Sequence, residues 1–261
     1  MIGFINSILS YFDARLVRKS SYKKLLSKLP LFYLKNDFSE LIDSKHRMTY
    51  FENFNDSKAQ LGQDLFVLSE LDFKKNGFFV EFGATNGIDL SNTFMLEKKF
   101  GWNGILAEPA KLWHSELELN RSSSIEFDCV WKTSGDILLF NEVKDDLHKG
   151  ELSTIDSFTS SDGHALERKS SNKYEVKTIS LYDMLKKHNA PRTIDYLSID
   201  TEGSEFEILS SFDFDEYDIK IITCEHNHTS RREKIFEMLS AQGYERKYTE
   251  YSLFDDWYVR K

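Results

Sequence analysis

Short apolar runs alternate with helical patterns along most of the chain, starting near residue 61. Apolar runs bounded by turn residues predict buried strands, and apolar residues recurring every three or four positions predict helices. The predicted strands are residues 78–82, 104–107, 125–131, 194–199 and 219–224. The predicted helices are residues 90–100, 112–119, 204–212 and 232–241. Strands alternating with helices of this length predict βαβ units, a mainly parallel sheet and an α/β fold.

Two further segments depart from this alternation. Residues 244–260 carry strand-like aromatic residues without a helical stripe, which predicts a terminal hairpin at the sheet edge. Residues 141–173 are polar and rich in serine, which predicts an insertion or loop between the two halves of the domain. A cover over a substrate and a plain surface loop are equally good interpretations of this insertion.

The first thirty residues predict an amphipathic helix outside the α/β domain. Its apolar positions recur at helical spacing at Ile2, Ile5, Ile8, Leu9 and Phe12, and a basic stretch follows at Arg15, Arg18, Lys19, Lys23, Lys24 and Lys28. We expect a helical extension over residues 1–55 and one domain over residues 56–261. The favoured interpretation of the basic residues is a solvated helix face. The alternative is peripheral contact with an anionic membrane surface.

Composition narrows the classes of function. The chain has 261 residues, enough for one large α/β domain, and a net charge of -9, which disfavours non-specific nucleic-acid binding. Cys129 and Cys224 stand alone in apolar runs, as expected in a reducing cytosol. The apolar start of the chain is too short for a membrane span and lacks the flanks of a signal peptide. We therefore expect a cytoplasmic protein, membrane-associated only if the basic helix binds a membrane.

A glycine-containing turn follows the first predicted strand. Gly83 would let a ligand approach the backbone closely, and the pair Asn86 and Gly87 tolerates the positive φ of a sharp turn. Asp89 or Ser91 could cap the next helix. The pattern is not that of a dinucleotide fold, and by itself an ordinary strand-to-helix turn explains it equally well. The candidate cofactor-binding residues here are Glu81, Gly83, Ala84, Asn86, Gly87, Ser91 and Asn92.

Acidic residues at later strand ends support a cofactor site. Glu108 ends the second strand, where an acid can accept hydrogen bonds from both ribose hydroxyls of a nucleoside. Asp128, in the third strand, could meet an adenine amino group, or could instead cap a turn or pair with Lys132.

From about residue 60 to the C-terminus, the chain resembles the FkbM family of methyltransferases. The matching stretches are residues 76–84, 90–93, 101–109, 194–203, 225–227 and 254–258. The resemblance implies a class I methyltransferase fold, Rossmann-like, with a mainly parallel seven-stranded sheet and helices on both faces. It also implies S-adenosylmethionine as cofactor and O-methylation of a sugar, glycan or secondary metabolite.

Methyl transfer to a hydroxyl requires a group that takes the hydroxyl proton. Ligands of an open α/β sheet bind beyond the carboxyl ends of its strands, where Asp200 and His226 follow the two later strands. His226 is the preferred general base, because its ordinary pKa lies near neutral pH, and a buried core histidine is the alternative. Asp200 could orient the acceptor, take the proton or contact the cofactor, and Glu202 completes the candidate catalytic set.

A divalent metal such as Mg²⁺ is a second interpretation of these strand ends. Asp200, Glu202, Glu225 and Asn227 offer the oxygen ligands that Mg²⁺ or Ca²⁺ prefers. The set is partly similar to that of catechol-type methyltransferases, from which its Glu-His-Asn run departs. A metal-free site is the favoured interpretation, and a site for a divalent metal is the alternative.

The acceptor, a small molecule or glycan, is expected to meet Gln63, Asp64, Glu225, Asn227 and Trp257. The resemblance covers Gln63 and Asp64, although Asp64 could equally cap a helix. Trp257 could stack on a sugar or could close the sheet edge.

Two other functions compete with methyl transfer. A nucleotide-dependent oxidoreductase or epimerase would share Gly83, Gly87 and Glu108, but it predicts a tyrosine–lysine dyad. The residues Tyr182 and Lys186 have that spacing, but on a predicted amphipathic helix where Lys186 is solvated. A non-catalytic binding module with the same fold is the other alternative.

Overall fold

The computed structural model describes residues 35–143, 150–159, 165–166, 168 and 170–261. The amphipathic helix predicted over residues 1–30 lies outside the described residues. The chain divides into two units, Met1–Ile42 and Asp43–Lys261, and the second contains the α/β domain. Within the described ranges, no helix combines the length and apolar character needed to cross a membrane.

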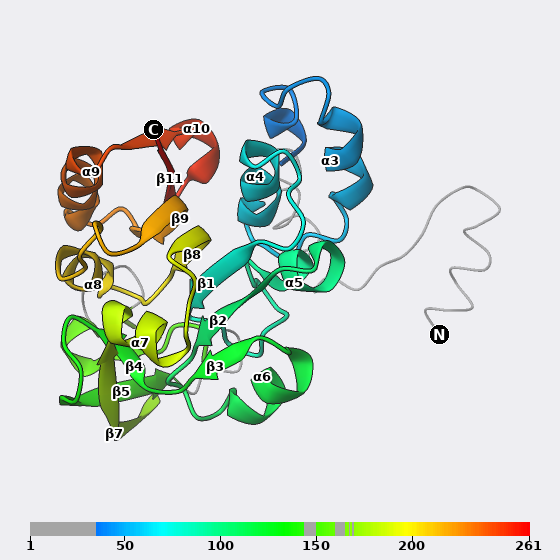
Figure 1. The fold of residues 1–261 in the computed structure, drawn as a ribbon. Helices are drawn as coiled ribbons and strands as arrows, with labels where there is room; N and C mark the ends of the chain where they lie inside the picture. The colour runs from blue at the N-terminus through cyan, green and yellow to red at the C-terminus, as the bar shows by residue number, and fades with distance from the viewer. Residues whose placement is uncertain (1–34, 144–149, 160–164, 167, 169) are drawn as a thin grey trace, which may run out of the picture. The chain divides into compact units, whose positions relative to one another are not determined.

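A seven-stranded sheet forms the centre of the second unit (Figure 1). Its strands, in spatial order, are β10 (Tyr244–Lys247), β11 (Asp255–Arg260), β9 (Asp218–Glu225), β8 (Thr193–Ile199), β1 (Phe78–Phe82), β2 (Asn103–Ala107) and β3 (Ser124–Glu126). The five strands from β9 to β3 are parallel, and β11 is antiparallel to both β9 and β10. The predicted mainly parallel sheet and the predicted hairpin at its edge are confirmed.

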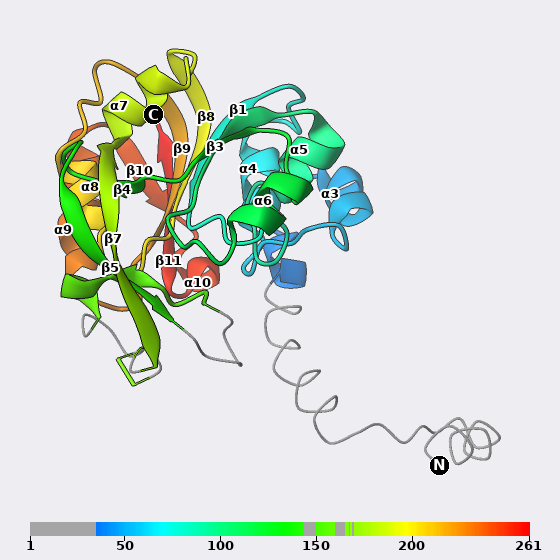
Figure 2. The ribbon, with the colours of Figure 1, turned by 90° about the horizontal axis from the view of Figure 1, so that it is seen from below.

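Helices cover both faces of this sheet (Figure 2). One face packs against α7 (Leu181–Lys187), α8 (Glu205–Ser210) and α9 (Arg231–Ala241), and the other against α4 (Gln63–Glu70), α5 (Phe94–Phe100) and α6 (His114–Asn120). The unit also contains the short helices α3 (Arg47–Asn53) and α10 (Thr249–Ser252). Buried side chains such as Val80, Leu197 and Leu209 form the core on the first face. Opposite them, Phe66 of α4 stacks on Trp257 of β11, with ring centroids 4.6 Å apart.

A second sheet of four strands is the main feature that the sequence interpretation missed. It contains, in spatial order, β4 (Cys129–Trp131), β7 (Ser171–Ser180), β5 (Ile137–Val143) and β6 (Thr154–Ile155), with a short 3-10 helix at Asp156–Phe158. The single strand predicted over residues 125–131 was wrong, because the chain leaves the large sheet after Glu126 and joins the second sheet at Cys129. The insertion predicted as a loop over residues 141–173 likewise contributes strands to this sheet.

The buried Arg121 anchors the helical face beside β1. Its Nε donates to Glu97 at 2.8 Å, and a second guanidinium nitrogen donates to Thr93 at 2.9 Å. Burial alone would raise the pKa of Glu97, but the charge of Arg121 and a hydrogen bond from Ser123 lower that pKa to about 2. The guanidinium also lies 5.5 Å from the centre of the Phe79 ring. Arg121 and its hydrogen-bonded partners therefore link β1, α5 and the C-terminal end of α6.

Replacing Arg121 with methionine is expected to lower the free energy of unfolding by about 3–5 kcal/mol, because it removes the buried counter-charge of Glu97 and leaves only the exposed Lys98 beside it. Urea denaturation measures the change. The matched control is Lys99→Met, which removes an exposed ion pair with Asp56 and should change stability by less than about 1 kcal/mol. Equal losses in the two variants would contradict the anchoring role.

Candidate functional site

A cavity of about 410 Å³ opens at the carboxyl ends of β1, β2, β8 and β9. Its walls are Gln60, Glu81, Phe82, Gly83, Thr85, Asp89, Leu90, Asn92, Ala107, Glu108, Pro109, Cys129, Val130, Phe140, Gly150, Glu151, Leu152, Ser153, Ile155, Asp200, Thr201, Glu202, Ser204, Glu225, Asn227 and Phe254. Seven of these described residues are acids, and none of them is lysine, arginine or histidine. The cavity therefore favours a ligand that carries positive charge or donates hydrogen bonds.

Gly83 brings the ends of β1 and β8 together. Its φ is +72°, and a Cβ added there would lie 2.3 Å from the carbonyl oxygen of Asp200. The Gly83 and Ala84 amides both donate to the carbonyl of Ala107, at 3.1 and 3.3 Å. The predicted close backbone approach at Gly83 is thus between two strand ends at the cavity wall. Ala84, the next residue of the turn, is buried.

Asn86 and Gly87 shape the turn rather than the cavity. Asn86 Oδ1 accepts hydrogen bonds from the backbone amides of Ile88 and Asp89, at 3.0 and 2.9 Å. Gly87 has φ +79°, and a Cβ there would lie 2.6 Å from Cγ of Arg121. Asn86 and Gly87 thus stabilise the turn, and the turn places Thr85 and Asp89 on the cavity wall.

Glu81 organises the segment that follows this turn. Its buried carboxylate accepts hydrogen bonds from the Ser91 hydroxyl at 3.0 Å, the Asn92 amide at 2.7 Å and the Thr93 hydroxyl at 2.5 Å. The helix predicted from residue 90 therefore begins only at Phe94. The side chain of Asn92 reaches across to Ser198 on β8, with Nδ2 2.9 Å from its hydroxyl.

Glu108 lies on the cavity wall just after β2. Its two oxygens accept hydrogen bonds from the backbone amides of Thr85 and Ala110, each at 2.8 Å. Burial raises the pKa of Glu108 to about 7, while these two hydrogen bonds act in the opposite direction. The carboxyl group is thus fixed in one orientation and lies where a ligand can reach it.

Asp128 lies in the break between β3 and β4. Its backbone amide donates to Glu126, and its carboxylate is 3.9 Å from Nζ of Lys177. The described cavity wall includes its neighbours Cys129 and Val130 but not Asp128. The structure therefore does not bring Asp128 to the cavity, because the strand expected to place it there is interrupted.

Asp200 and Glu225 form a pair of carboxyl groups at the ends of two adjacent strands. Asp200 follows β8 and Glu225 ends β9, and a hydrogen bond joins their side chains. Burial, with the nearby charge of Glu205, raises the pKa of Asp200 to about 7. Burial, with the charge of Asp200, raises the pKa of Glu225 well above its ordinary value. A raised pKa in both members is the behaviour of neighbouring carboxyl groups that do not readily ionise together.

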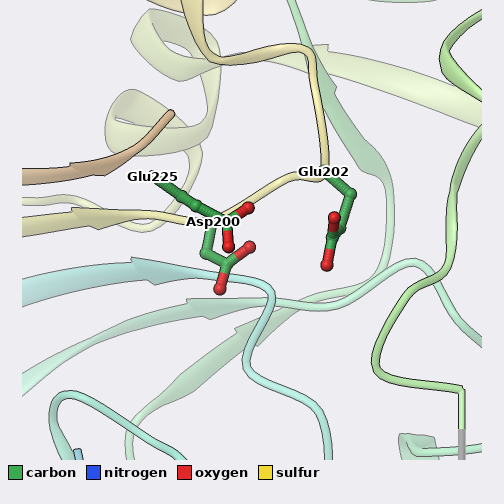
Figure 3. A group of neighbouring side chains, drawn as sticks. All are labelled: Asp200, Glu202 and Glu225. Carbon is green, nitrogen blue, oxygen red and sulfur yellow. The ribbon is translucent and has the colours of Figure 1, made fainter. Parts of the chain in front are cut away.

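Glu202 brings a third carboxylate to the pair (Figure 3). Carboxylate oxygens of Asp200, Glu202 and Glu225 lie within 4.8 Å of one another. Glu202 is fixed in place by Arg168, whose guanidinium donates to Oε2 at 2.7 Å, and by Nδ2 of Asn227 at 3.4 Å. The predicted metal candidates are thus brought together, with Asn227 bonded to Glu202.

Arg168 was missed by the sequence interpretation. Its side chain is fully buried, and its Nε donates to the Leu152 carbonyl at 2.9 Å while it binds Glu202. Arg168 therefore links Leu152, on the cavity wall, to Glu202 in the loop after β8. The polar insertion contains several basic residues, and nothing in its pattern distinguishes this arginine. Glu205, in the first turn of α8, is also buried, and it accepts hydrogen bonds from the backbone amides of Thr201 and Gly203.

His226 has a different environment from the one predicted. Its ring is buried, Nδ1 accepts a hydrogen bond from the His228 amide, and Nε2 lies 3.8 Å from Asp256. Burial lowers the pKa of His226 to about 4. His226 borders a separate cavity beside α9, together with Arg231. The structure therefore matches the alternative of a buried histidine more closely than that of a base facing the main cavity.

A small chamber of about 50 Å³ adjoins the main cavity next to the Asp200–Glu225 pair. Gln63 and Asp255 form part of its wall, and Gln63 Nε2 donates to Asp255 Oδ2 at 3.0 Å. Burial raises the pKa of Asp255 to about 8. Asp64 lies apart from the chamber and accepts hydrogen bonds from the Ser57 hydroxyl and the Leu65 amide. Gln63 is thus near the candidate site, whereas Asp64 serves the helix start.

Trp257 is not placed to stack on a sugar. It is 1 % exposed, lies flat against Phe66 and donates from Nε1 to Asp255 Oδ2 at 3.2 Å. Its ring is covered by Phe66 of α4, which packs on this face of the sheet. The strand itself is internal, with β10 outside it. The prediction of Trp257 as an acceptor contact is wrong, and so is the alternative that it closes the sheet edge, because β10 and not β11 lies at that edge.

Residues 81–248 match the family model of the methyltransferase FkbM domain, which covers more than half of the chain. No curated protein matches the sequence.

Among the solved structures that match the chain, three have low identity and TM-scores below 0.5. A methyltransferase FkbM from Methylobacillus flagellatus is 11% identical, with a TM-score of 0.45, and the match covers 91% of this chain and 60% of that one. A precorrin-6y C5,15-methyltransferase from Geobacter metallireducens is 12% identical, with a TM-score of 0.37, over 75% and 85% of the two chains. A fibrillarin/Nop5p complex is 9% identical, with a TM-score of 0.35, over 71% and 73%.

Proposed function

Since the chain belongs to the FkbM family of methyltransferases, we propose that it transfers a methyl group from S-adenosylmethionine to a hydroxyl of a sugar, glycan or secondary metabolite. The observation that carries this proposal is the acidic cavity between Gly83, Glu108 and Asp200. Its volume of about 410 Å³ falls in the range typical of sites for small ligands and cofactors. Its lining suits a cofactor with a positively charged sulfur.

The residues present fit this cofactor in two ways. A Cβ at Gly83 would collide with the Asp200 backbone. Glycine at this position therefore lets the ends of β1 and β8 lie close together at the cavity wall. The fixed carboxyl group of Glu108 can accept hydrogen bonds from the two ribose hydroxyls. S-adenosylmethionine, when bound, supplies a methyl group already activated on sulfur.

The Asp200–Glu225 pair supplies the base for the acceptor. Bound S-adenosylmethionine would supply the methyl group to the acceptor oxygen, and its sulfur would keep the electron pair of the broken bond. The hydroxyl proton passes to the ionised carboxylate of the pair. We assign the base to this pair rather than to His226, because both acids line the cavity and the imidazole faces Asp256. Glu202, Asn227 and Gln63 are proposed to orient the acceptor.

Calorimetric titration with S-adenosylmethionine and, separately, with NAD tests the assignment. We expect one S-adenosylmethionine site per chain, with a Kd in the range of about 1 µM to 1 mM, and no heat with NAD. This comparison separates methyl transfer from the nucleotide-dependent oxidoreductase with the same type of sheet. Binding of NAD and not of S-adenosylmethionine would reject the proposed function.

A further inference from the structure

We propose that Asp200, Glu202 and Glu225 bind a divalent cation, with Asp255 and Asn92 receiving hydrogen bonds from its water ligands. The chemistry expected is that of a hard ion such as Mg²⁺, Mn²⁺ or Ca²⁺, because every donor atom is an oxygen. The proposal goes beyond methyl transfer, which the residues can support without an ion.

The first step of the argument is the placement of the three carboxylates. Their oxygens lie within 4.8 Å of one another, and they come from two adjacent strand ends, so that one ion can contact all three (Figure 3). Arg168 binds Oε2 of Glu202 and fixes the orientation of that carboxylate. A carboxylate can bind a guanidinium through one oxygen and a metal ion through the other, so Arg168 does not compete for the ion.

The second step is independent of the acidic cluster and concerns the small chamber beside it. Asp255 is 4 % exposed and lines this chamber together with Asp200 and Glu225. Its Oδ2 is bonded to Gln63 and Trp257, but its Oδ1 makes no hydrogen bond within the described part of the chain. A buried carboxyl oxygen without a hydrogen-bond partner is costly, and a nearby cation would both favour the ionised form of Asp255 and supply water ligands that donate to this oxygen.

The direction of Asp255 follows from the sheet. Asp255 and Glu225 are directly opposite each other in the antiparallel register of β11 and β9. Directly opposed residues of such a pair point to the same face of the sheet, which places both carboxyl groups on the chamber side. Asn92 lines the same chamber, and its buried Oδ1 also makes no hydrogen bond to the residues that the structure describes. Asp255 and Asn92 thus each bring to the wall beside the carboxylate pair an acceptor oxygen that no described donor reaches.

The chamber fits the water ligands of an ion. Its volume of about 50 Å³ is enough for a few ordered waters. Water bound to a divalent cation is a strong donor, and Asp255 Oδ1 and Asn92 Oδ1 are the acceptors placed to receive its hydrogens. None of the described residues on the main cavity wall is basic, so a cation bound in place of the pair's proton would compensate the charge of Asp200 and Glu225.

Titration of the full-length protein with Mn²⁺, followed by electron paramagnetic resonance after treatment with EDTA, tests the proposal. We expect one saturable site with a Kd on the order of 10 µM, within the range of oxygen-donor sites, and displacement of Mn²⁺ by excess Mg²⁺ or Ca²⁺. Glu202→Gln and Glu225→Gln should each weaken Mn²⁺ binding at least about tenfold. The matched control Glu216→Gln, on an exposed turn, should bind as the wild type does.

Asp255→Asn provides a second variant that leaves the three direct ligands in place, and it should weaken Mn²⁺ binding about three- to tenfold. Circular dichroism checks that each variant is folded. Absence of a saturable site in the wild type, or unchanged affinity in both glutamate variants, would overturn the proposal. The titration contains neither S-adenosylmethionine nor acceptor, so failure of the ion site and failure of the proposed function are separate results.

Discussion

Glu108→Gln is expected to weaken S-adenosylmethionine binding at least about a hundredfold. Hydrogen bonds to a charged group contribute about 1.5–3 kcal/mol each, and the two ribose hydroxyls would donate to this one carboxylate. A loss of about 3 kcal/mol in total corresponds to two orders of magnitude in Kd. The amide nitrogen of glutamine would also face the Thr85 or Ala110 amide, both of which donate to Glu108 in the native protein.

Isothermal titration calorimetry measures this effect, and thermal melting verifies that the variant is folded. The matched control is Glu118→Gln on the exposed surface of α6, which should leave Kd within about twofold of the wild type. If Glu108→Gln binds the cofactor as tightly as Glu118→Gln does, Glu108 does not contact the ribose.

Asp200→Asn is expected to reduce methyl transfer about 100- to 10 000-fold, the usual contribution of a positioned base. S-adenosylmethionine binding should weaken by no more than about tenfold, because the Asp200 backbone that contacts Gly83 is unchanged. Glu225→Gln should have a similar effect on the rate, since the two carboxyls act as a pair. Transfer of label from methyl-labelled S-adenosylmethionine to a library of polyols and glycosides measures the rate.

The dependence of this rate on pH provides a second readout. Burial raises the pKa of Asp200 to about 7, so the pair lacks a free base at lower pH. The rate should therefore rise through about pH 7 and then level off, and the inflection should be lost or moved in Asp200→Asn. The exposed variant Asp215→Asn should keep both the rate and the inflection. A wild-type rate in Asp200→Asn, with an unchanged profile, would exclude the pair as the base and favour a different group.

The parts of the site that could be predicted from the sequence are the residues that directly follow a strand, because a strand is recognised from its local pattern of apolar residues. Glu108 follows an apolar strand, and Gly83 follows another, so the order of strands and helices places both at the same edge of the sheet. The same logic correctly placed Asp200 and Glu225 at adjacent strand ends. Local patterns are sufficient in these cases because strand direction and strand end are both visible in the sequence.

The parts that could not be predicted depend on contacts between distant segments. The break after Glu126 lies within residues 125–131, where apolar and acidic residues alternate as in a single half-buried strand, so the pattern gives no sign that Asp128 leaves the sheet. The antiparallel pairing of β5 with β7 joins residues more than thirty positions apart, such as Phe140 and Tyr174. Arg168 reaches Glu202 only because this second sheet brings the insertion back to the loop after β8. The buried state of Trp257 likewise depends on a distant segment, α4, whose Phe66 stacks on its ring.

The most direct test of the account is a crystal structure of the protein with S-adenosylhomocysteine. We predict that the ribose hydroxyls will lie at hydrogen-bond distance, about 2.7–3.2 Å, from the Glu108 carboxylate, with the sulfur facing Asp200 and Glu225. A cofactor bound elsewhere, or bound in this cavity with its ribose away from Glu108, would contradict the account.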